Sequence, residues 1–263
     1  MDRRPIGIFD SGVGGLTVVD KLLRHLPEEN IIYFGDTARV PYGNKSKGTV
    51  TRFSKEIVTF LLKFRVKLII IACNTASSLS LETLKRSFKV PFIGVIDPGV
   101  EEALEVTGTG RIGIIGTEAT VSSEAYKTKI LSVDKNSFVL QKSCPLLVPL
   151  VENGWLSNKI AYGIVKEYLS PLLKKNIDTL ILGCTHYPLL KNTIKKFVGK
   201  GVKLVDSSTA AAKYTYRILD KKGLLARNMK PYVKFFASDD TKKFKKTARI
   251  FLKRKIDVKK IIF

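Results

Sequence analysis

Two cysteines of this 263-residue sequence stand in matching surroundings. Cys73 follows the apolar run Leu-Ile-Ile-Ile-Ala and precedes Asn-Thr, and Cys184 follows Leu-Ile-Leu-Gly and precedes Thr-His. Each cysteine is therefore expected where a buried strand ends and a helix begins, which is where ligands bind in open α/β sheets. The free N–H groups and the positive end of a helix lower a thiol pKa from about 8.5 and attract carboxylates.

Such a pair of thiols has a specific chemical use. Inversion of a carbon acid needs a base on one face of the carbon and an acid on the other, and two groups of one type can exchange these roles. Cys73 and Cys184, facing each other across a cleft, could do this for an amino acid. Cys144 precedes a proline and an apolar segment and has no counterpart, so we expect it to be a buried structural residue.

Polar residues beside the two thiols could bind the rest of such a substrate. Asn74 and Thr75 follow Cys73, and Thr185 follows Cys184, so that their donors could hold an α-carboxylate. His186, one of only two histidines, could orient or protonate a group near Cys184.

A glycine-rich turn follows the first expected strand, in Asp10-Ser11-Gly12-Val13-Gly14-Gly15. It is similar to a dinucleotide-binding loop, and Asp36 lies near the place of a ribose-binding acid, but Thr17 stands at the third fingerprint position. The same glycines suit a tight turn from which Asp10 and Ser11 project, with Asp10 acting on a substrate ammonium or on Cys73. A dinucleotide-dependent oxidoreductase therefore stays an alternative.

Three further patterns bear on the site. Val40-Pro41-Tyr42-Gly43 predicts a turn, which either only connects elements or touches a ligand with its backbone. Glu152 interrupts an apolar stretch, as an acid at a helix end does. Zinc could use cysteine, histidine and aspartate ligands, but the sequence has no CxxC, HxxxH or HExxH spacing, so we expect no metal and no cofactor.

Short apolar runs alternate with longer amphipathic stretches along the chain, which predicts parallel sheets covered by helices on both faces. The pattern runs once and then restarts, because Ile6-Gly7-Ile8-Phe9 is echoed by Ile112-Gly113-Ile114-Ile115. Strands are expected at 5–9, 31–34, 68–72, 91–96, 111–115, 179–182 and 202–205. Helices are expected at 16–25, 47–64, 77–87, 122–131, 159–174 and 189–197. The prediction is an α/β protein of two pseudo-symmetric parallel-sheet domains, with the active site in the cleft between them.

Composition and charge indicate where the protein is located and what it could bind. We find no signal peptide and no apolar stretch of membrane-spanning length, and three widely spaced cysteines do not make a disulfide framework, so we expect a cytoplasmic protein. The net charge is +23, and residues 221–263 are especially rich in lysine. This charge could attract an anionic substrate from a solvated surface, or it could bind nucleic acid.

The motifs together resemble the aspartate/glutamate racemase family, and within it the glutamate racemases. The resemblance runs from about Ile6 to Ser207 and rests on Phe9–Gly15, Gly35–Thr37 with Pro41–Gly43, Ala72–Ala76, Gly116–Thr120, Val151-Glu152 and Gly183–Pro188. The related aspartate racemases usually carry glutamate after the second Cys-Thr. His186 therefore favours glutamate as the substrate.

The resemblance implies interconversion of L- and D-glutamate without cofactor or metal, supplying D-glutamate for peptidoglycan. It implies catalytic roles for Cys73, Cys184, Asp10, His186 and Glu152. It also implies substrate contacts from Asp10, Ser11, Tyr42, Gly43, Asn74, Thr75, Thr185 and His186.

The same resemblance implies how the chain is organised. The family's C-terminal segment returns to the first domain, so we expect one domain at 1–96 plus 207–263 and the other at 97–206. A homodimer is left open. Five residues precede Ile6, so we do not expect regulation through the N-terminal extension of some members. The alternative is a racemase fold that binds nucleic acid through its basic C-terminal region, beside or instead of catalysis.

Overall fold

The computed structural model describes residues 2–227 and 230–263 and contains two parallel β-sheets. Sheet A has the strand order β10-β9-β2-β1-β3-β4, and sheet B has the order β6-β5-β7-β8. The strands of sheet A are β1 (Ile6–Asp10), β2 (Ile31–Gly35), β3 (Leu68–Ile71), β4 (Phe92–Gly94), β9 (Val233–Ala237) and β10 (Val258–Lys260). Those of sheet B are β5 (Arg111–Gly116), β6 (Phe138–Ser143), β7 (Thr179–Gly183) and β8 (Lys203–Asp206). The prediction of two parallel-sheet α/β domains is confirmed.

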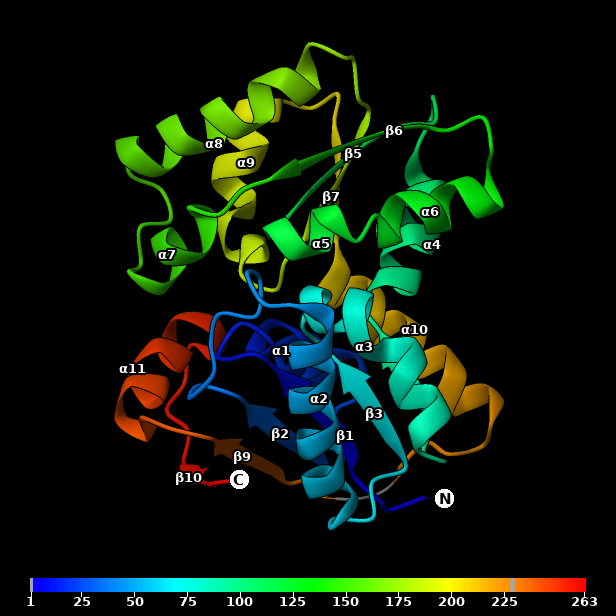
Figure 1. The fold of residues 1–263 in the computed structure, drawn as a ribbon, viewed down its shortest axis with the longest axis vertical. Coiled ribbons are helices and arrows are strands. Elements are labelled where there is room, and N and C mark those ends of the chain that lie inside the picture. Colours follow the sequence, from blue (N-terminus) through cyan, green and yellow to red (C-terminus); the bar gives the residue numbers. More distant parts are fainter. Residues whose placement is uncertain (1, 228–229) are drawn as a thin grey trace.

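Helices cover both faces of each sheet (Figure 1). The sheet-A domain contains sheet A with α1 (Leu16–His25), α2 (Lys47–Leu62), α3 (Asn74–Ser87), α10 (Ser207–Lys221) and α11 (Thr241–Leu252). The sheet-B domain contains sheet B with α4 (Ile96–Val106), α5 (Glu118–Ser122), α6 (Ala125–Val133), α7 (Leu147–Glu152), α8 (Lys159–Leu173), the 3-10 helix η1 (Tyr187–Leu190) and α9 (Lys191–Val198). The two domains are stacked along the long axis of the molecule.

Burial explains why the strands read as unbroken apolar runs. All five residues of β1, β2 and β7 are buried, as strands covered on both faces must be. On one face of sheet A, α2 and α3 pack on Phe9, Phe34 and Ile71. On the other face, α1 and α11 pack on Ile8 and other residues of the larger core cluster, which continues into the sheet-B domain.

The internal repeat predicted from the Ile-Gly-Ile strands is present in the strand register. In sheet A, β1 lies beside β3, with Phe9 opposite Ile71 two residues before Cys73. In sheet B, β5 lies beside β7, with Gly116 opposite Gly183 one residue before Cys184. Each cysteine thus ends a central strand of its own sheet.

The structure differs from the sequence prediction at several element boundaries. The helix expected from Ser77 begins at Asn74, because Cys73 serves as its N-cap. The strand expected at 91–96 ends at Gly94, and Ile96 already starts α4. No pattern in the sequence predicted β6, an edge strand whose six residues are all half-buried or exposed.

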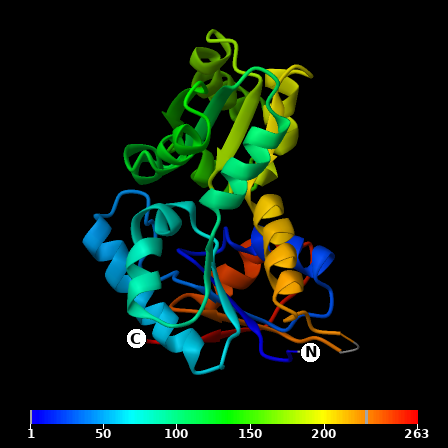
Figure 2. The ribbon, with the colours of Figure 1, turned by 90° about the vertical axis from the view of Figure 1, so that its right-hand side faces the viewer.

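The C-terminal segment returns to sheet A. Figure 2 shows α10 running from the sheet-B domain down beside the sheet-A domain, where it packs on α1. β9 then pairs with β2, and β10 pairs with β9. The basic C-terminal region is therefore part of the folded core, with Phe235, Phe236 and Phe244 buried.

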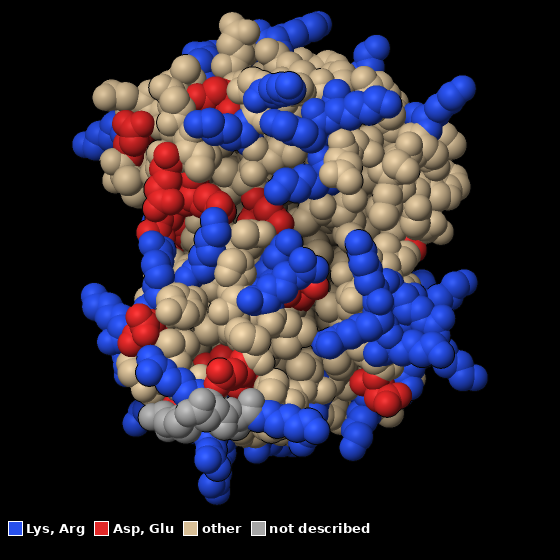
Figure 3. Space-filling view, turned by 180° about the vertical axis from the view of Figure 1, so that it is seen from behind, with Lys and Arg blue, Asp and Glu red and all other residues tan. Residues whose placement is uncertain are grey.

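Lys and Arg side chains are spread over both domains on the face seen in Figure 3. On this face, the basic side chains are thus not confined to the C-terminal region. Among the helices of the described residues, none combines the length and apolar character needed to cross a membrane.

Candidate active site

A cavity of about 430 Å³ lies between the domains, at the loops that follow β1, β3, β5 and β7. Both domains contribute to its wall. Most of the residues expected in the site line this cavity, namely Ser11, Tyr42, Gly43, Cys73, Asn74, Glu152, Cys184, Thr185 and His186. The two thiols, which are 111 positions apart in the sequence, therefore face one space.

Cys73 caps α3, and its pKa is raised. The backbone N–H of Ala76 donates to its Sγ at 3.4 Å, and the thiol donates to Ser11 Oγ at 3.7 Å. Burial, followed by the nearby Asp10 carboxylate, raises the pKa of Cys73 to about 12, although the two hydrogen bonds act in the opposite direction. The expectation that a helix N-terminus favours a thiolate is thus wrong for Cys73, because desolvation outweighs it.

Cys184 has a cationic neighbour. His186 Nδ1 lies 3.9 Å from Cys184 Sγ, and His186 Nε2 lies 3.1 Å from Glu152 Oε1. Burial alone would lower the pKa of His186, but the hydrogen bonds to Cys184 and Glu152 raise it to about 10. The bond to His186 in turn lowers the pKa of Glu152. Near neutral pH, an imidazolium therefore bridges a carboxylate and the Cys184 sulfur.

Asp10 lies behind the cavity wall, fully buried. Its Oδ2 accepts from the backbone N–H of Gly12 at 2.9 Å, and Thr185 Oγ1 donates to its Oδ1 at 3.5 Å. Burial raises the pKa of Asp10, while the charge of His186 acts against this. Asp10 thus shapes the glycine-rich turn and links it to the sheet-B domain.

The glycines of this turn are explained by close packing. A Cβ added at Gly14 would lie 2.3 Å from Thr185 Oγ1 and 2.5 Å from His186 Cε1. A Cβ at Gly15 would lie 2.6 Å from the Cβ of Asp10. The bare backbone therefore allows the turn to meet the sheet-B domain, and this contact accounts for the glycine pattern without a dinucleotide.

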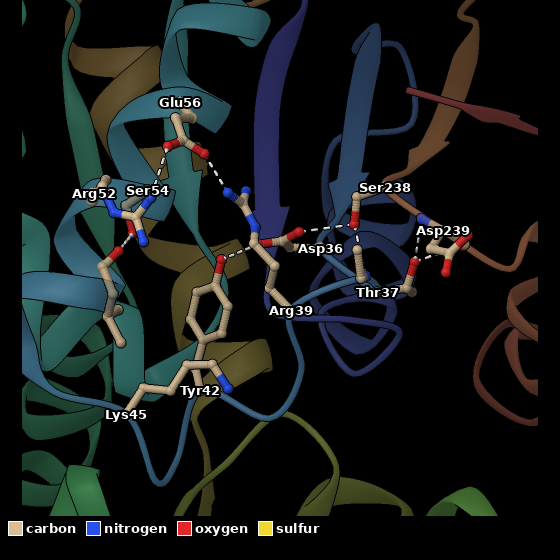
Figure 4. A network of polar contacts seen from close by, with 12 residues as sticks. Asp36, Thr37, Arg39, Tyr42, Lys45, Arg52, Ser54, Glu56, Ser238 and Asp239 are labelled. Carbon is tan, nitrogen blue, oxygen red and sulfur yellow. Dashed lines mark hydrogen bonds and ion pairs between the residues drawn. The ribbon is translucent and has the colours of Figure 1, made fainter. Parts of the chain in front are cut away.

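A buried polar network around Asp36 holds the turn at Val40–Gly43 in place (Figure 4). The Tyr42 hydroxyl donates to Asp36 Oδ2, Arg39 Nε donates to the same oxygen at 2.7 Å, and Ser238 Oγ donates to Oδ1 at 2.8 Å. Arg39 also pairs with Glu56 of α2. Burial and the Asp36 charge raise the pKa of Tyr42, so its hydroxyl stays a donor. The turn also reaches the other domain, because Ala119 N–H donates to the Gly43 carbonyl at 3.0 Å.

Thr75 and Asn74 connect the start of α3 with the sheet-B domain. Thr75 Oγ1 lies 2.8 Å from Thr117 Oγ1 and 3.3 Å from Thr120 Oγ1, so Thr75 lies behind the cavity wall. Tyr126 donates to Asn74 Oδ1 at 2.7 Å. These contacts fix the start of α3 against the sheet-B domain beside the cavity.

The sequence reasoning did not assign several residues of the wall. Thr117, Glu118, Pro145, Val148, Pro149 and Asn153 also line the cavity. Thr117 and Glu118 follow β5 just as Asn74 follows β3, so the internal repeat was a usable signal for them. The other four belong to α7 and its flanks, where no helix was expected from the sequence. No three His, Cys, Asp or Glu side chains of the described residues gather as metal ligands would.

Comparisons with known proteins agree with this geometry. Residues 6–215 match the family described as Asp/Glu/Hydantoin racemase. A glutamate racemase from Persephonella marina is 50% identical over 257 residues, which are 97% of this chain and 96% of the relative. Among solved structures, a glutamate racemase isoform from Bacillus anthracis has a TM-score of 0.96 at 41% identity, covering 99% of this chain and 98% of its own. A Francisella tularensis glutamate racemase in complex with D-glutamate has a TM-score of 0.92 at 41% identity, with the same coverage.

Proposed function

Because the chain belongs to the Asp/Glu/hydantoin racemase family, we propose that it interconverts L- and D-glutamate by moving the α-proton between two thiols. The observation that carries this proposal is the placement of Cys73 and Cys184, one from each domain, on the wall of a single cavity. Each thiol ends a central strand of its sheet, so the internal repeat supplies the two opposed groups.

The reaction balances with these residues alone. A thiolate on one side takes the α-proton, the C–H bond breaks, and its electron pair is delocalised into the substrate carboxylate. The thiol on the other side then donates its proton to the opposite face of the carbon. The product has inverted configuration, and the two sulfurs have exchanged protonation states, so the reverse reaction starts from that state.

The resting protein is proposed to carry a proton on Cys73, whose raised pKa supports this assignment. Cys184 then acts as the base in the direction that starts from this state. The His186 imidazolium beside its sulfur balances the negative charge, and Glu152 holds the far nitrogen of the ring. In the opposite direction Cys184 is the acid and Cys73 the base.

The remaining polar groups are proposed to hold the substrate. Asn74 at the start of α3 and Thr185 line the cavity and offer donors to a carboxylate. Ser11 and the backbone of Tyr42 and Gly43 line the same cavity and suit the other polar groups of glutamate. Asp10 acts on Cys73 through its charge.

A three-variant experiment tests the thiol assignment. We expect Cys73→Ser and Cys184→Ser to lower racemisation by roughly 10²- to 10⁴-fold, the usual contribution of a general acid or base. Cys144→Ser is the matched control, because Cys144 is also buried but does not line the cavity. Optical rotation and loss of the α-proton signal would be followed in heavy water with chelator present, for glutamate and for aspartate. Full activity in either of the first two variants would contradict the mechanism.

The cellular setting follows from the same proposal. D-Glutamate from this reaction would feed peptidoglycan synthesis, and thus cell-wall formation and cell shape. The three cysteines are free, which supports a reducing cytoplasmic location. A homodimer stays a prediction. Racemisation is favoured over the nucleic-acid-binding alternative, because the basic region completes sheet A and the named relatives are racemases.

A further inference from the structure

α11 of the sheet-A domain packs against the site through His186. The ring of Phe251 lies 5.5 Å from the His186 ring, centroid to centroid, with an angle of 86° between the planes. Both side chains are buried, with Phe251 5% and His186 6% exposed. The two residues come from different domains, so this contact crosses the domain interface.

A second element of the sheet-A domain approaches the same ring. The backbone of Gly14 is so close that an added Cβ would lie 2.5 Å from His186 Cε1 and 2.6 Å from Nδ1. The ring is therefore enclosed by Gly14 and Phe251, while its nitrogens bond to Glu152 and Cys184 of its own domain.

α11 also approaches Glu152, the other partner of His186. Lys243 and Glu152 both line a small cavity of about 210 Å³ beside the site, and the positive charge of Lys243 contributes to lowering the pKa of Glu152. α11 thus faces the His186–Glu152 pair at two of its residues.

We propose that Phe251 is a positioning residue, which holds the His186 ring so that Nδ1 meets Cys184 and Nε2 meets Glu152. A histidine ring can rotate about two side-chain bonds. Hydrogen bonds at both ring nitrogens still allow the ring to rock about the line that joins those nitrogens. An aromatic ring at right angles to the imidazole restricts that motion. The inference rests on the proposed function and assigns α11 to the Cys184 side of the reaction.

The first test compares Phe251→Leu with Phe236→Leu. Phe236 belongs to the same domain and is 6% exposed, but it packs on Phe60 and Phe64 in the core on the other face of sheet A. We expect Phe251→Leu to lower kcat/KM by roughly 3- to 10-fold, since an aromatic pair contributes about 0.5–1.5 kcal/mol. Phe236→Leu should leave kcat/KM near the wild-type value, and both variants should lower the unfolding temperature to a similar degree.

Isotope effects separate positioning from a general loosening of the structure. With α-deuterated glutamate, the isotope effect should rise in the direction in which Cys184 removes the deuteron. It should fall in the other direction, because reprotonation by Cys184 then limits the rate. Isotope effects that move together in both directions would overturn the inference.

Nuclear magnetic resonance gives a reading that does not depend on turnover. The chain has two histidines, so the ring-proton signals of His186 can be identified against those of His25. Phe251→Leu should shift the His186 signals, and Phe236→Leu should not. If Phe251→Leu does not fold, Phe251→Met keeps the apolar volume and tests the same contact.

The outcomes distinguish the two proposals. A wild-type protein that does not racemise glutamate would overturn the proposed function, and this inference with it. A wild-type protein that racemises glutamate, with Phe251 variants that match Phe236→Leu in both rate and ring signals, would overturn the inference alone.

Discussion

The contact of Gly14 with the sheet-B domain makes Gly14→Ala an informative perturbation. The new methyl group would lie 2.3 Å from Thr185 Oγ1 and 2.5 Å from His186 Cε1. Carbon atoms in contact are ordinarily about 3.5–4.0 Å apart, so Thr185 and His186 must move by about 1 Å. A misplacement of about 1 Å can cost about 10²-fold in rate, equivalent to about 2.7 kcal/mol of activation free energy.

The assay for this prediction is kcat/KM in both directions. Because L- and D-glutamate have equal free energy, the two directions must lose the same factor, which gives an internal check on the measurement. Gly163→Ala is the control, since Gly163 lies in α8 with nothing within 4 Å of an added Cβ. This control should keep full activity and gain about 1 kcal/mol of stability from reduced chain entropy. A Gly14→Ala variant whose kcat/KM lies within about twofold of the wild-type value, on the order of measurement error, would refute the reasoning.

Two further predictions concern buried charges. The folded pKa of His186, about 10, lies above its ordinary 6.5, so its charge contributes stability that is fully present below about pH 6.5 and is lost as the pH rises through about 10. In denaturant unfolding, the free energy of unfolding of His186→Gln should be lower than that of the wild type by a few kcal/mol at pH 6. The difference should shrink towards pH 10, and a difference that stays constant would contradict the raised pKa of His186. Lys67 Nζ lies 2.6 Å from Glu29 Oε2 with both side chains buried, so Lys67→Met should cost about 3–5 kcal/mol of unfolding free energy. Adding Glu29→Gln should recover part of that loss, and a further loss would count against the ion pair.

Most of the residues that line the cavity could be predicted from the sequence, because they lie just after the ends of strands. Apolar runs such as Leu68–Ile71 are readable as strands, and the residue after a parallel strand lies at the ligand-binding edge. The pairing of Cys73 with Cys184 therefore followed from the internal repeat and from the family resemblance. Their protonation did not follow, because burial and charge depend on which side chains surround each sulfur.

The contribution of the C-terminal segment could not be predicted in detail. The pattern of α11 shows a buried face at Phe244 and Phe251, but nothing local indicates that this face meets residue 186. Likewise, the place of Ser238 beside Asp36 depends on the pairing of β9 with β2. Both are long-range contacts, which residue spacing does not encode.

The assembly of sheet A from both ends of the chain has a consequence for biosynthesis. Sheet B is encoded within residues 111–206, so its strands can pair as soon as that stretch has left the ribosome. The apolar edge of β2 at Ile31–Gly35 must wait for β9 at Val233–Ala237, about 200 residues later. Until then the nascent polypeptide exposes an unpaired strand edge of the kind that promotes aggregation. We therefore expect truncation just before β9 to yield a chaperone-dependent, insoluble product, although both thiols are already present in it.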